Sequence, residues 1–150
     1  MNLQQNVRPL INFATSRFGL LSVTEDKIIV FVNGIPGFER LRRFILIDHD
    51  PEGLFKWLQA VDDPTTAFLL TNPNLFKPDY TVPLRKPEME CLGAGDQKSI
   101  VIFVIVCVST ADKKISLNLK GPVVFNAANM RAIQCVIDRD DYLSHFEVKV

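Results

Sequence analysis

The chain has 150 residues, of which 47% are hydrophobic and 23% charged, so it has the length of one domain and the composition of a folded protein. Its 17 basic residues balance its 17 acidic residues, and no net field favours nucleic acid or an anionic membrane surface as a direct partner. We therefore expect one domain over residues 1–150 that contacts neither nucleic acid nor membrane.

The cysteines indicate a reducing compartment. Cys91, Cys107 and Cys135 are odd in number and form no CxxC pair, which is typical of free thiols. Cys107 and Cys135 lie in apolar or strand-like segments, where cysteine usually packs as a small hydrophobic residue. The first nine residues lack the pattern of a signal peptide, and the apolar run Ile100 to Val108 is shorter than the ~20 residues of a membrane-spanning helix. These features predict a cytoplasmic protein.

The N-terminal part of the chain predicts strands and a shaped loop. β-branched and aromatic residues between Ile11 and Val32 favour two strands joined by a turn near Thr24–Asp26. The glycines and proline of Asn33–Gly37 must end the second strand in a tight loop. The apolar spacing within Phe38–Phe44 then predicts one or two helical turns.

The middle of the chain predicts a hairpin followed by loops. Phe44–Ile47 favours a short strand, and Phe55–Val61 and Ala67–Thr71 favour a hairpin. Prolines crowd the next stretch as far as residue 98 and predict irregular structure. A short helix is expected at Glu88–Leu92, with Pro87 at its first position and Gly93 at its end.

The last third of the chain predicts further strands. The nearly continuous apolar run Ser99–Val108 favours a central strand, and the alternation over Ile115–Leu119 favours a half-buried one. Val123–Phe125 and Ala132–Ile137 predict a final hairpin. We expect the extreme N-terminus and the tail after residue 138 to be loosely ordered. Eight or nine short strands predict a mostly β fold: an antiparallel, β-barrel-like single domain with one or two short helices, or a sandwich closed on itself.

No motif for catalysis or for metal binding is present in the sequence. His49 and His145 lie far apart without the neighbours of a zinc site, and the chain has neither a P-loop nor a GxSxG elbow. Asp62 and Asp63 form the one carboxylate pair that could divide acid and base roles, although acids before a proline are more typical of a turn. We predict no enzyme activity, no metal and no cofactor. A small-ligand barrel or a hydrolase using Asp62 and Asp63 is the alternative.

Aromatic residues on stiff loops are candidates for partner contacts. The loop from Gly34 to Glu39 fits either a recognition loop or a plain turn with Phe38 packed inward. Trp57 and Phe68 are expected in the core. Phe76, Asp79 and Tyr80 are expected to be exposed in the proline-rich stretch, where a stiff loop binds a partner at low entropic cost.

Several motifs stand in a fixed order along the chain. They are Phe31–Glu39 (FVNGIPGFE), Phe55–Pro64 (FKWLQAVDDP), Ala67-Phe68, Thr71-Asn72-Pro73, Pro78-Asp79-Tyr80 and Ser116–Asn126 (SLNLKGPVVFN). With these motifs the chain resembles the FliW family of flagellar assembly factors between about Phe13 and Ile137. The resemblance implies a non-enzymatic, β-barrel-like cytoplasmic protein. It also implies binding of flagellin before export and antagonism of the translational regulator CsrA, which would couple flagellin translation to export. RNA would contact CsrA and not this chain.

Candidate contact residues follow from the same resemblance, without assignment to either partner. They are Gly34, Ile35, Pro36, Phe38, Glu39, Gln59, Asp62, Asn72, Phe76, Asp79 and Tyr80. The chain departs from the family pattern at Gly121, where alanine is usual, and in the tail Tyr142–Phe146, which lacks the usual basic ending. Glycine at position 121 is expected to loosen a strand end at a cost of about 0.5–1 kcal/mol.

Overall fold

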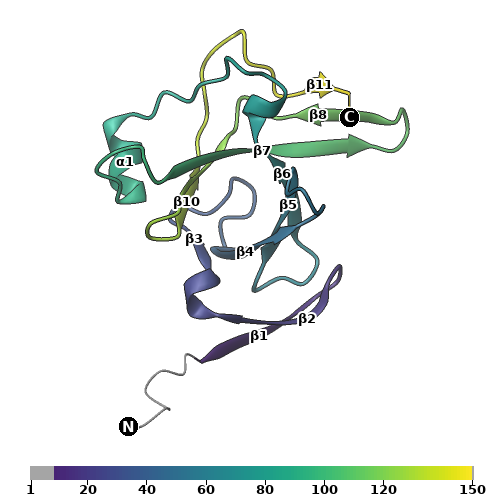
Figure 1. The fold of residues 1–150 in the computed structure, drawn as a ribbon, viewed down its shortest axis with the longest axis vertical. Coiled ribbons are helices and arrows are strands. Elements are labelled where there is room, and N and C mark those ends of the chain that lie inside the picture. Colours follow the sequence, from purple (N-terminus) through teal and green to yellow (C-terminus); the bar gives the residue numbers. More distant parts are fainter. Residues whose placement is uncertain (1–8, 150) are drawn as a thin grey trace.

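Residues 9–149 are described in the computed structural model, where the apolar segments of the chain form eleven strands (Figure 1). The strands are β1 (Leu10–Thr15), β2 (Gly19–Thr24), β3 (Ile29–Phe31), β4 (Arg43–Asp48), β5 (Phe55–Ala60), β6 (Ala67–Thr71), β7 (Ile100–Ser109), β8 (Lys114–Leu117), β9 (Val123–Asn126), β10 (Arg131–Gln134) and β11 (Phe146–Val148). The helical elements are α1 (Lys86–Leu92) and the 3-10 turns η2 (Glu25–Lys27) and η3 (Pro73–Leu75).

Seven of these strands close into a barrel in the order β7-β6-β5-β4-β3-β10-β9, with β9 returning to β7. The ten-residue strand β7 makes closure possible because it is longer than its neighbours. Its first half pairs with β9 from Ile100 to Phe103, and its second half pairs with β8 from Val106 to Ser109. The pairings are antiparallel except that of β3 with β10, which is parallel. The predicted barrel is therefore confirmed.

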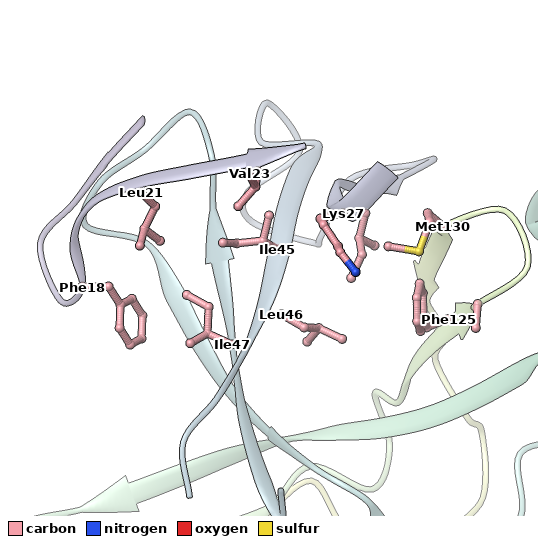
Figure 2. Close-up of a pocket in the computed structure, with 11 residues that line it drawn as sticks. Phe18, Leu21, Val23, Lys27, Ile45, Leu46, Ile47, Phe125 and Met130 are labelled. Carbon is pink, nitrogen blue, oxygen red and sulfur yellow. The ribbon is translucent and has the colours of Figure 1, made fainter. Parts of the chain in front are cut away.

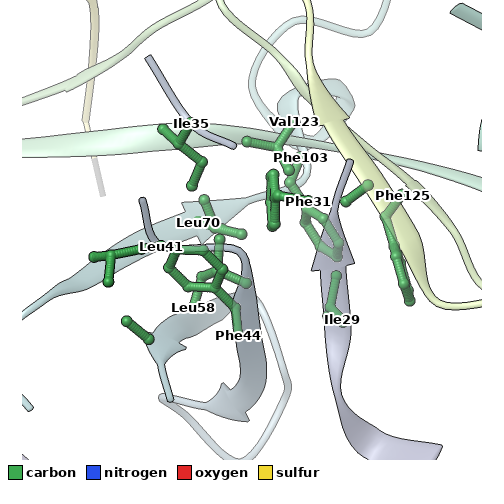
Figure 3. Close-up of a cluster of buried hydrophobic side chains, with 12 residues drawn as sticks. Ile29, Phe31, Ile35, Leu41, Phe44, Leu58, Leu70, Phe103, Val123 and Phe125 are labelled. Carbon is green, nitrogen blue, oxygen red and sulfur yellow. The ribbon is translucent and has the colours of Figure 1, made fainter. Parts of the chain in front are cut away.

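Side chains fill the barrel interior (Figure 3). The cluster includes Ile29, Phe31, Phe44, Leu58, Leu70 and Phe103, and Phe31 and Phe44 meet edge to face with ring centroids 5.1 Å apart. The space that remains among them is about 10 Å³, no more than the minimum that holds a single water molecule. A filled interior counts against the small-ligand barrel that the sequence left open.

The β1–β2 hairpin forms a separate two-stranded sheet at one end of the molecule (Figure 1). Phe13 of β1 packs with Ile45 of β4 and with Val61, so the hairpin covers an outer face of the barrel. Among the described residues, one backbone hydrogen bond joins hairpin and barrel, from Ser16 N to Pro64 O at 2.9 Å. Side-chain packing therefore provides most of the attachment.

The segment after residue 138 is ordered, contrary to expectation. β11 pairs with β8 and extends the β7–β8 ribbon beyond the barrel. Tyr142 is 2% exposed and packs with Leu117, Leu119 and Ile137 in a second core cluster. Apolar burial by Tyr142 and Phe146 outweighs the charged composition of this segment. The expectation for the extreme N-terminus concerns residues that lie outside the described part of the chain.

Two local predictions are wrong for physical reasons. Phe38–Phe44 forms a turn followed by the start of β4 and no helix, because Ile35 and Leu41 both anchor in the barrel core and hold the loop to it. Ile11–Val32 forms three strands instead of two, because Gly19, at φ +72°, starts β2 directly after a tight turn. Local propensity gives way to tertiary anchoring in the first case.

Other predictions hold. The β5–β6 hairpin, the central strand β7 and the β9–β10 hairpin are confirmed. Helix α1 begins two residues before Glu88 and ends, as expected, at Gly93 in the left-handed conformation. Cys135 is buried as predicted, whereas Cys107 is exposed.

Candidate partner-binding surfaces

Two buried side chains anchor the loop between β3 and β4 to the barrel core. Ile35 is 2% exposed and Leu41 is 4% exposed, and both belong to the barrel core. Phe38 N donates to Ile35 O at 2.7 Å and Leu41 N donates to Phe38 O at 2.9 Å, which closes two successive turns. Gly34 is buried at the base of the loop with φ +70°. The loop is therefore shaped by its anchors and by its glycines.

Phe38 is the aromatic side chain that this loop presents to solvent. It is 38% exposed, and its ring stands edge to face against Phe68 with centroids 5.2 Å apart. Phe68 in turn lies 6.3 Å from Phe44 of the core. The interpretation with Phe38 packed inward is therefore partly right, because one side of the ring packs against Phe68. The recognition role of the exposed side stays a prediction. Trp57 and Phe68, expected in the core, are half-buried.

Glu39 adds a fixed negative charge beside Phe38. Its Oε1 accepts a hydrogen bond from Gly37 N at 3.0 Å, and backbone hydrogen bonds lower the pKa of Glu39 below its usual value. The carboxylate is therefore ionised near neutral pH.

The turn after β5 carries Asp62 and Asp63 in structural roles. Arg43 donates two hydrogen bonds to Asp62, at 2.6 and 3.1 Å, and the bond to Arg43 lowers the pKa of Asp62. Asp63 accepts from Thr65 N at 3.0 Å and from the Thr66 hydroxyl at 2.9 Å, and these bonds lower its pKa as well. Two ionised carboxylates with separate partners do not form an acid–base pair. The turn interpretation is confirmed, and the hydrolase alternative is not supported.

Gln59 holds this turn from inside. Its side chain is fully buried, and Nε2 donates to Ala60 O at 3.0 Å, to Thr66 O at 3.2 Å and to Asp63 O at 3.4 Å. Its Oε1 has no hydrogen-bond partner among the described residues. In this conformation Gln59 shapes the turn and does not reach the surface.

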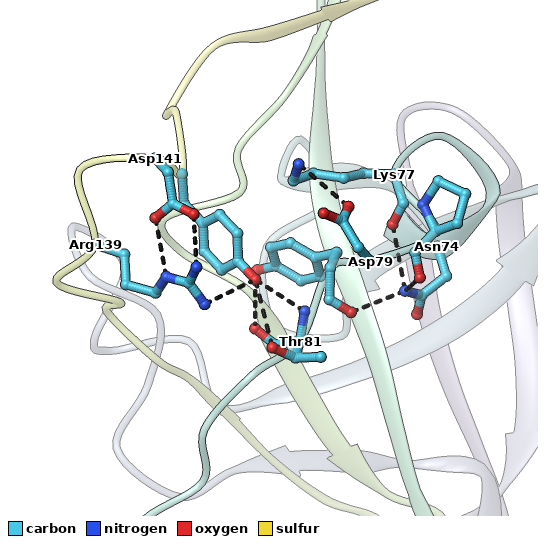
Figure 4. A network of polar contacts seen from close by, with 9 residues as sticks. Asn74, Lys77, Asp79, Thr81, Arg139 and Asp141 are labelled. Atoms are coloured by element: carbon cyan, nitrogen blue, oxygen red, sulfur yellow. Dashed lines mark hydrogen bonds and ion pairs between the residues drawn. The ribbon is translucent and has the colours of Figure 1, made fainter.

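A second group of candidate residues lies at the opposite end of the β5–β6 hairpin. Figure 4 shows polar contacts of the segment that follows, including those of Asn74 and Asp79. Asn72 Oδ1 accepts a hydrogen bond from Asn74 N at 2.9 Å and begins η3. The Asn74 side chain donates to Tyr80 O at 2.9 Å, and Lys77 forms an ion pair with Asp79 at 3.3 Å. The result is a compact loop.

Tyr80 is buried, so its predicted exposure is wrong. It is 4% exposed, its hydroxyl donates to Leu119 O at 2.7 Å, and its ring lies 4.7 Å from that of Tyr142. Burial is the main cause that raises the pKa of Tyr80. Apolar surroundings and a good acceptor explain why an aromatic residue on a proline-rich loop turns inward here. Phe76 is half-buried and Asp79 is exposed.

The structure therefore divides the candidate residues into two surfaces and a supporting set. The glycine-loop surface comprises the exposed residues Pro36, Phe38, Glu39 and Asp62, and the proline-loop surface comprises Asn72, Phe76 and Asp79. The supporting set is Gly34, Ile35, Gln59 and Tyr80, whose side chains or Cα are buried. Contact of either surface with a partner stays a prediction.

Gly121 is more constrained than the sequence suggested. A Cβ at this position would lie 2.9 Å from both Asn118 Nδ2 and Gln134 Nε2. Gly121 also accepts a hydrogen bond from Gln134 Nε2 at 2.9 Å. The glycine makes room for two amide side chains at the start of β9.

Sequence reasoning missed an apolar groove at the mouth of the barrel (Figure 2). It lies between the β1–β2 hairpin, β4 and the β9–β10 turn, and its volume is about 510 Å³. The lining residues are Phe18, Leu21, Val23, Lys27, Ile29, Ile45, Leu46, Ile47, Phe125, Ala127 and Met130. Three segments that are distant in sequence form it, so no local pattern could have indicated it.

Between residues 9 and 149, no group of three or more His, Cys, Asp or Glu side chains is arranged to hold a metal ion. No helix in that part of the chain is long and apolar enough to cross a membrane.

The closed ring of seven strands with a filled interior defines the class of the fold as a small, mostly antiparallel β-barrel. The family model described as "FliW protein" matches residues 12–148. The flagellar assembly factor FliW of Caldanaerobacter subterraneus subsp. tengcongensis is 40% identical over 130 residues, which cover 86% of this chain and 87% of that protein. The flagellar assembly factor FliW of Thermoanaerobacter pseudethanolicus is 38% identical, with the same coverage.

A solved structure agrees with these sequence matches. The crystal structure of a flagellar assembly factor FliW superposes with a TM-score of 0.83 at 26% identity, covering 93% of this chain and 98% of that chain. The chain belongs to the FliW family. Its relatives are named as assembly factors and not as enzymes, which agrees with the predicted non-enzymatic role.

Proposed function

We propose that this protein acts in the bacterial cytoplasm, binds flagellin before export and, in exchange, binds and antagonises the translational regulator CsrA. Flagellin that has not been exported occupies this protein. Export of flagellin frees this protein, which then holds CsrA away from the flagellin messenger RNA. Translation then follows export. Membership of the FliW family supports the flagellar part of this proposal.

The observation that carries the binding role is the position of Phe38. A partly exposed aromatic ring, supported by Phe68 and held on a loop anchored by Ile35 and Leu41, is already placed for contact. Such a ring loses little conformational entropy on binding, and aromatic residues dominate the energetics of protein interfaces. Balanced charge on the chain agrees with protein partners and with an RNA contact made by CsrA.

Calorimetric titration of the full chain with flagellin, and separately with CsrA, tests the proposal. We expect one-to-one binding of each partner, and displacement of CsrA when flagellin is added. Binding of neither partner at low salt would overturn the proposal.

Two single substitutions compare the proposed surfaces. Phe38→Ala and Phe76→Ala each remove an aromatic ring, the first from the glycine-loop surface and the second from the proline-loop surface. A ring that anchors an interface should weaken binding by about 2 kcal/mol, or roughly 30-fold, when it is removed. Leu143→Ala, at an exposed residue outside both surfaces, is the control. Equal binding by all variants would exclude both rings as anchors.

A further inference from the structure

The groove at the barrel mouth differs from the two loop surfaces in chemistry. Its walls are almost entirely apolar, and it is open to solvent along one side. Ile45 and Ile47 form part of its floor, the hairpin residues Leu21 and Val23 form one wall, and Phe125 and Met130 form the far end (Figure 2). Open apolar clefts of this size are binding sites in many proteins.

Among residues 9–149, Lys27 is the one charged residue that lines the groove. Its side-chain nitrogen points in among the apolar side chains (Figure 2). None of the ion pairs within residues 9–149 involves Lys27. An ammonium group beside an apolar floor favours an occupant that carries a carboxylate next to apolar groups.

Met130 shows that the far end of the groove is held in a specific conformation. Its φ is +62°, in the left-handed region that non-glycine residues rarely adopt. Its backbone N donates to Asn126 O at 2.9 Å, and its backbone O accepts from Val30 N at 2.9 Å, which fixes it between β9 and β3. The flexible thioether thus lies in the groove, where it can adapt to an occupant.

The apolar walls also limit the kind of occupant. An extended peptide in this groove would leave its backbone N–H and C=O groups without partners. A helix satisfies these groups internally, and its polar side can face the open side of the groove. We propose that the groove binds an amphipathic helix of a protein partner, with an acidic residue of that helix beside Lys27.

This inference rests on the proposed function only in taking flagellin and CsrA as the first proteins to test. Lys27→Glu reverses the charge in the groove, and Ala127→Asp places a carboxylate on its exposed rim. Lys98→Glu makes the same charge change at an exposed residue that does not line the groove, and serves as the control. We expect the two groove variants to bind one of the two proteins about tenfold more weakly, and the control to bind it unchanged.

A pair of synthetic peptides tests the groove independently of those partners. Both peptides form amphipathic helices of about 15 residues with one leucine stripe, flanked by glutamate in one and by lysine in the other. Methyl NMR should show shifts at Ile45, Ile47 and Met130 on addition of the glutamate peptide, and the preference should reverse in Lys27→Glu.

The outcomes separate the two proposals. If the native chain binds flagellin or CsrA and the groove variants bind equally well, the groove inference is wrong and the proposed function stands. If neither protein binds the native chain but the glutamate peptide shifts the groove methyl groups, the function is wrong and the groove inference stands. Absence of peptide shifts, or equal shifts with both peptides, would overturn the inference.

Discussion

Gly34 and Glu39 approach so closely that the loop between β3 and β4 has room for glycine alone at position 34. A Cβ on Gly34 would lie 2.7 Å from Glu39 Cα and 2.8 Å from Glu39 O. The φ of Gly34 is +70°, which L-residues with side chains rarely adopt. The approach fixes the position of Glu39, and with it the neighbouring Phe38.

Gly34→Ala and Gly37→Ala form a matched pair that tests this approach. Both residues have positive φ, but a Cβ on Gly37 would meet no atom of residues 9–149 within 4 Å. We expect Gly37→Ala to lower the free energy of unfolding by about 1–2 kcal/mol through backbone strain alone. Gly34→Ala should lower the free energy of unfolding clearly more, because its Cβ also clashes with the backbone of Glu39. Urea denaturation measures the free energy of unfolding of both variants. Equal losses would show that the clash relaxes freely.

The buried hydroxyl of Tyr80 gives a second prediction. Tyr80→Phe removes the hydrogen bond to Leu119 O and leaves a buried acceptor, so it should lower the free energy of unfolding by about 1–2 kcal/mol. Tyr80→Leu also removes the ring contact with Tyr142 and should cost more. Thermal and urea unfolding measure the order of the two variants. A Tyr80→Phe variant as stable as the native chain would contradict the hydrogen-bond role.

Hydrogen bonds to three aspartates predict a loss of stability in acid. Asp50 accepts from Leu54 N at 2.9 Å and from Phe55 N at 2.8 Å, and these bonds lower its pKa. The pKa values of Asp62 and Asp63 are lowered as well. A pKa that is lower in the folded chain means that the stabilisation is complete above the unfolded value of about 3.9 and is lost as pH falls through the folded value.

The melting temperature should therefore fall as the pH is lowered from about 5 toward 2. Asp50→Asn and Asp63→Asn should each make that fall less steep than it is in the native chain. Scanning calorimetry over this pH range measures the slope. Parallel curves for all variants would show that these carboxylates do not carry the pH dependence.

The three cysteines should differ in reactivity. Burial, with a further contribution from the charge of Glu88, raises the pKa of Cys135 to about 12, and a thiol of that pKa has almost no thiolate near neutral pH. Cys107 is exposed on β7. At pH 8 we expect Cys107 to react with a maleimide first and Cys135 to react only after unfolding, as mass spectrometry of Cys107→Ser can verify. Labelling of native Cys135 as fast as Cys107 would contradict the burial.

Strand positions were predictable because alternation and apolar runs record burial directly. The run over Ser99–Val108 indicated the central strand, and the turn chemistry of Asp62-Asp63-Pro64 indicated the β5–β6 hairpin. The pairing of β9 with β7, which closes the barrel, could not be predicted from the sequence. It depends on β7 pairing with both β8 and β9 through different residues of the same strand.

Exposure within the candidate surfaces was harder to predict. Tyr80 and Phe76 occupy the same loop and have similar local sequence surroundings, yet one is buried against Tyr142 and the other is half-buried. The tail residue that covers Tyr80 lies 62 positions further along the chain. A local sequence pattern does not indicate contacts between residues this far apart in the chain. For the same reason the groove, which distant segments form, could not be predicted.

The β1–β2 hairpin is attached to the barrel mainly through side-chain packing, and this has a consequence for how the fold can diversify. Residues 10–24 share no strand pairing with the closed barrel and one backbone hydrogen bond with it. Changes of length or side chain in the hairpin would therefore leave the ring of barrel pairings intact. The hairpin also forms a wall of the groove. Substitutions in the hairpin could therefore change what fits in the groove during evolution, while the strand pairings of the barrel stay the same.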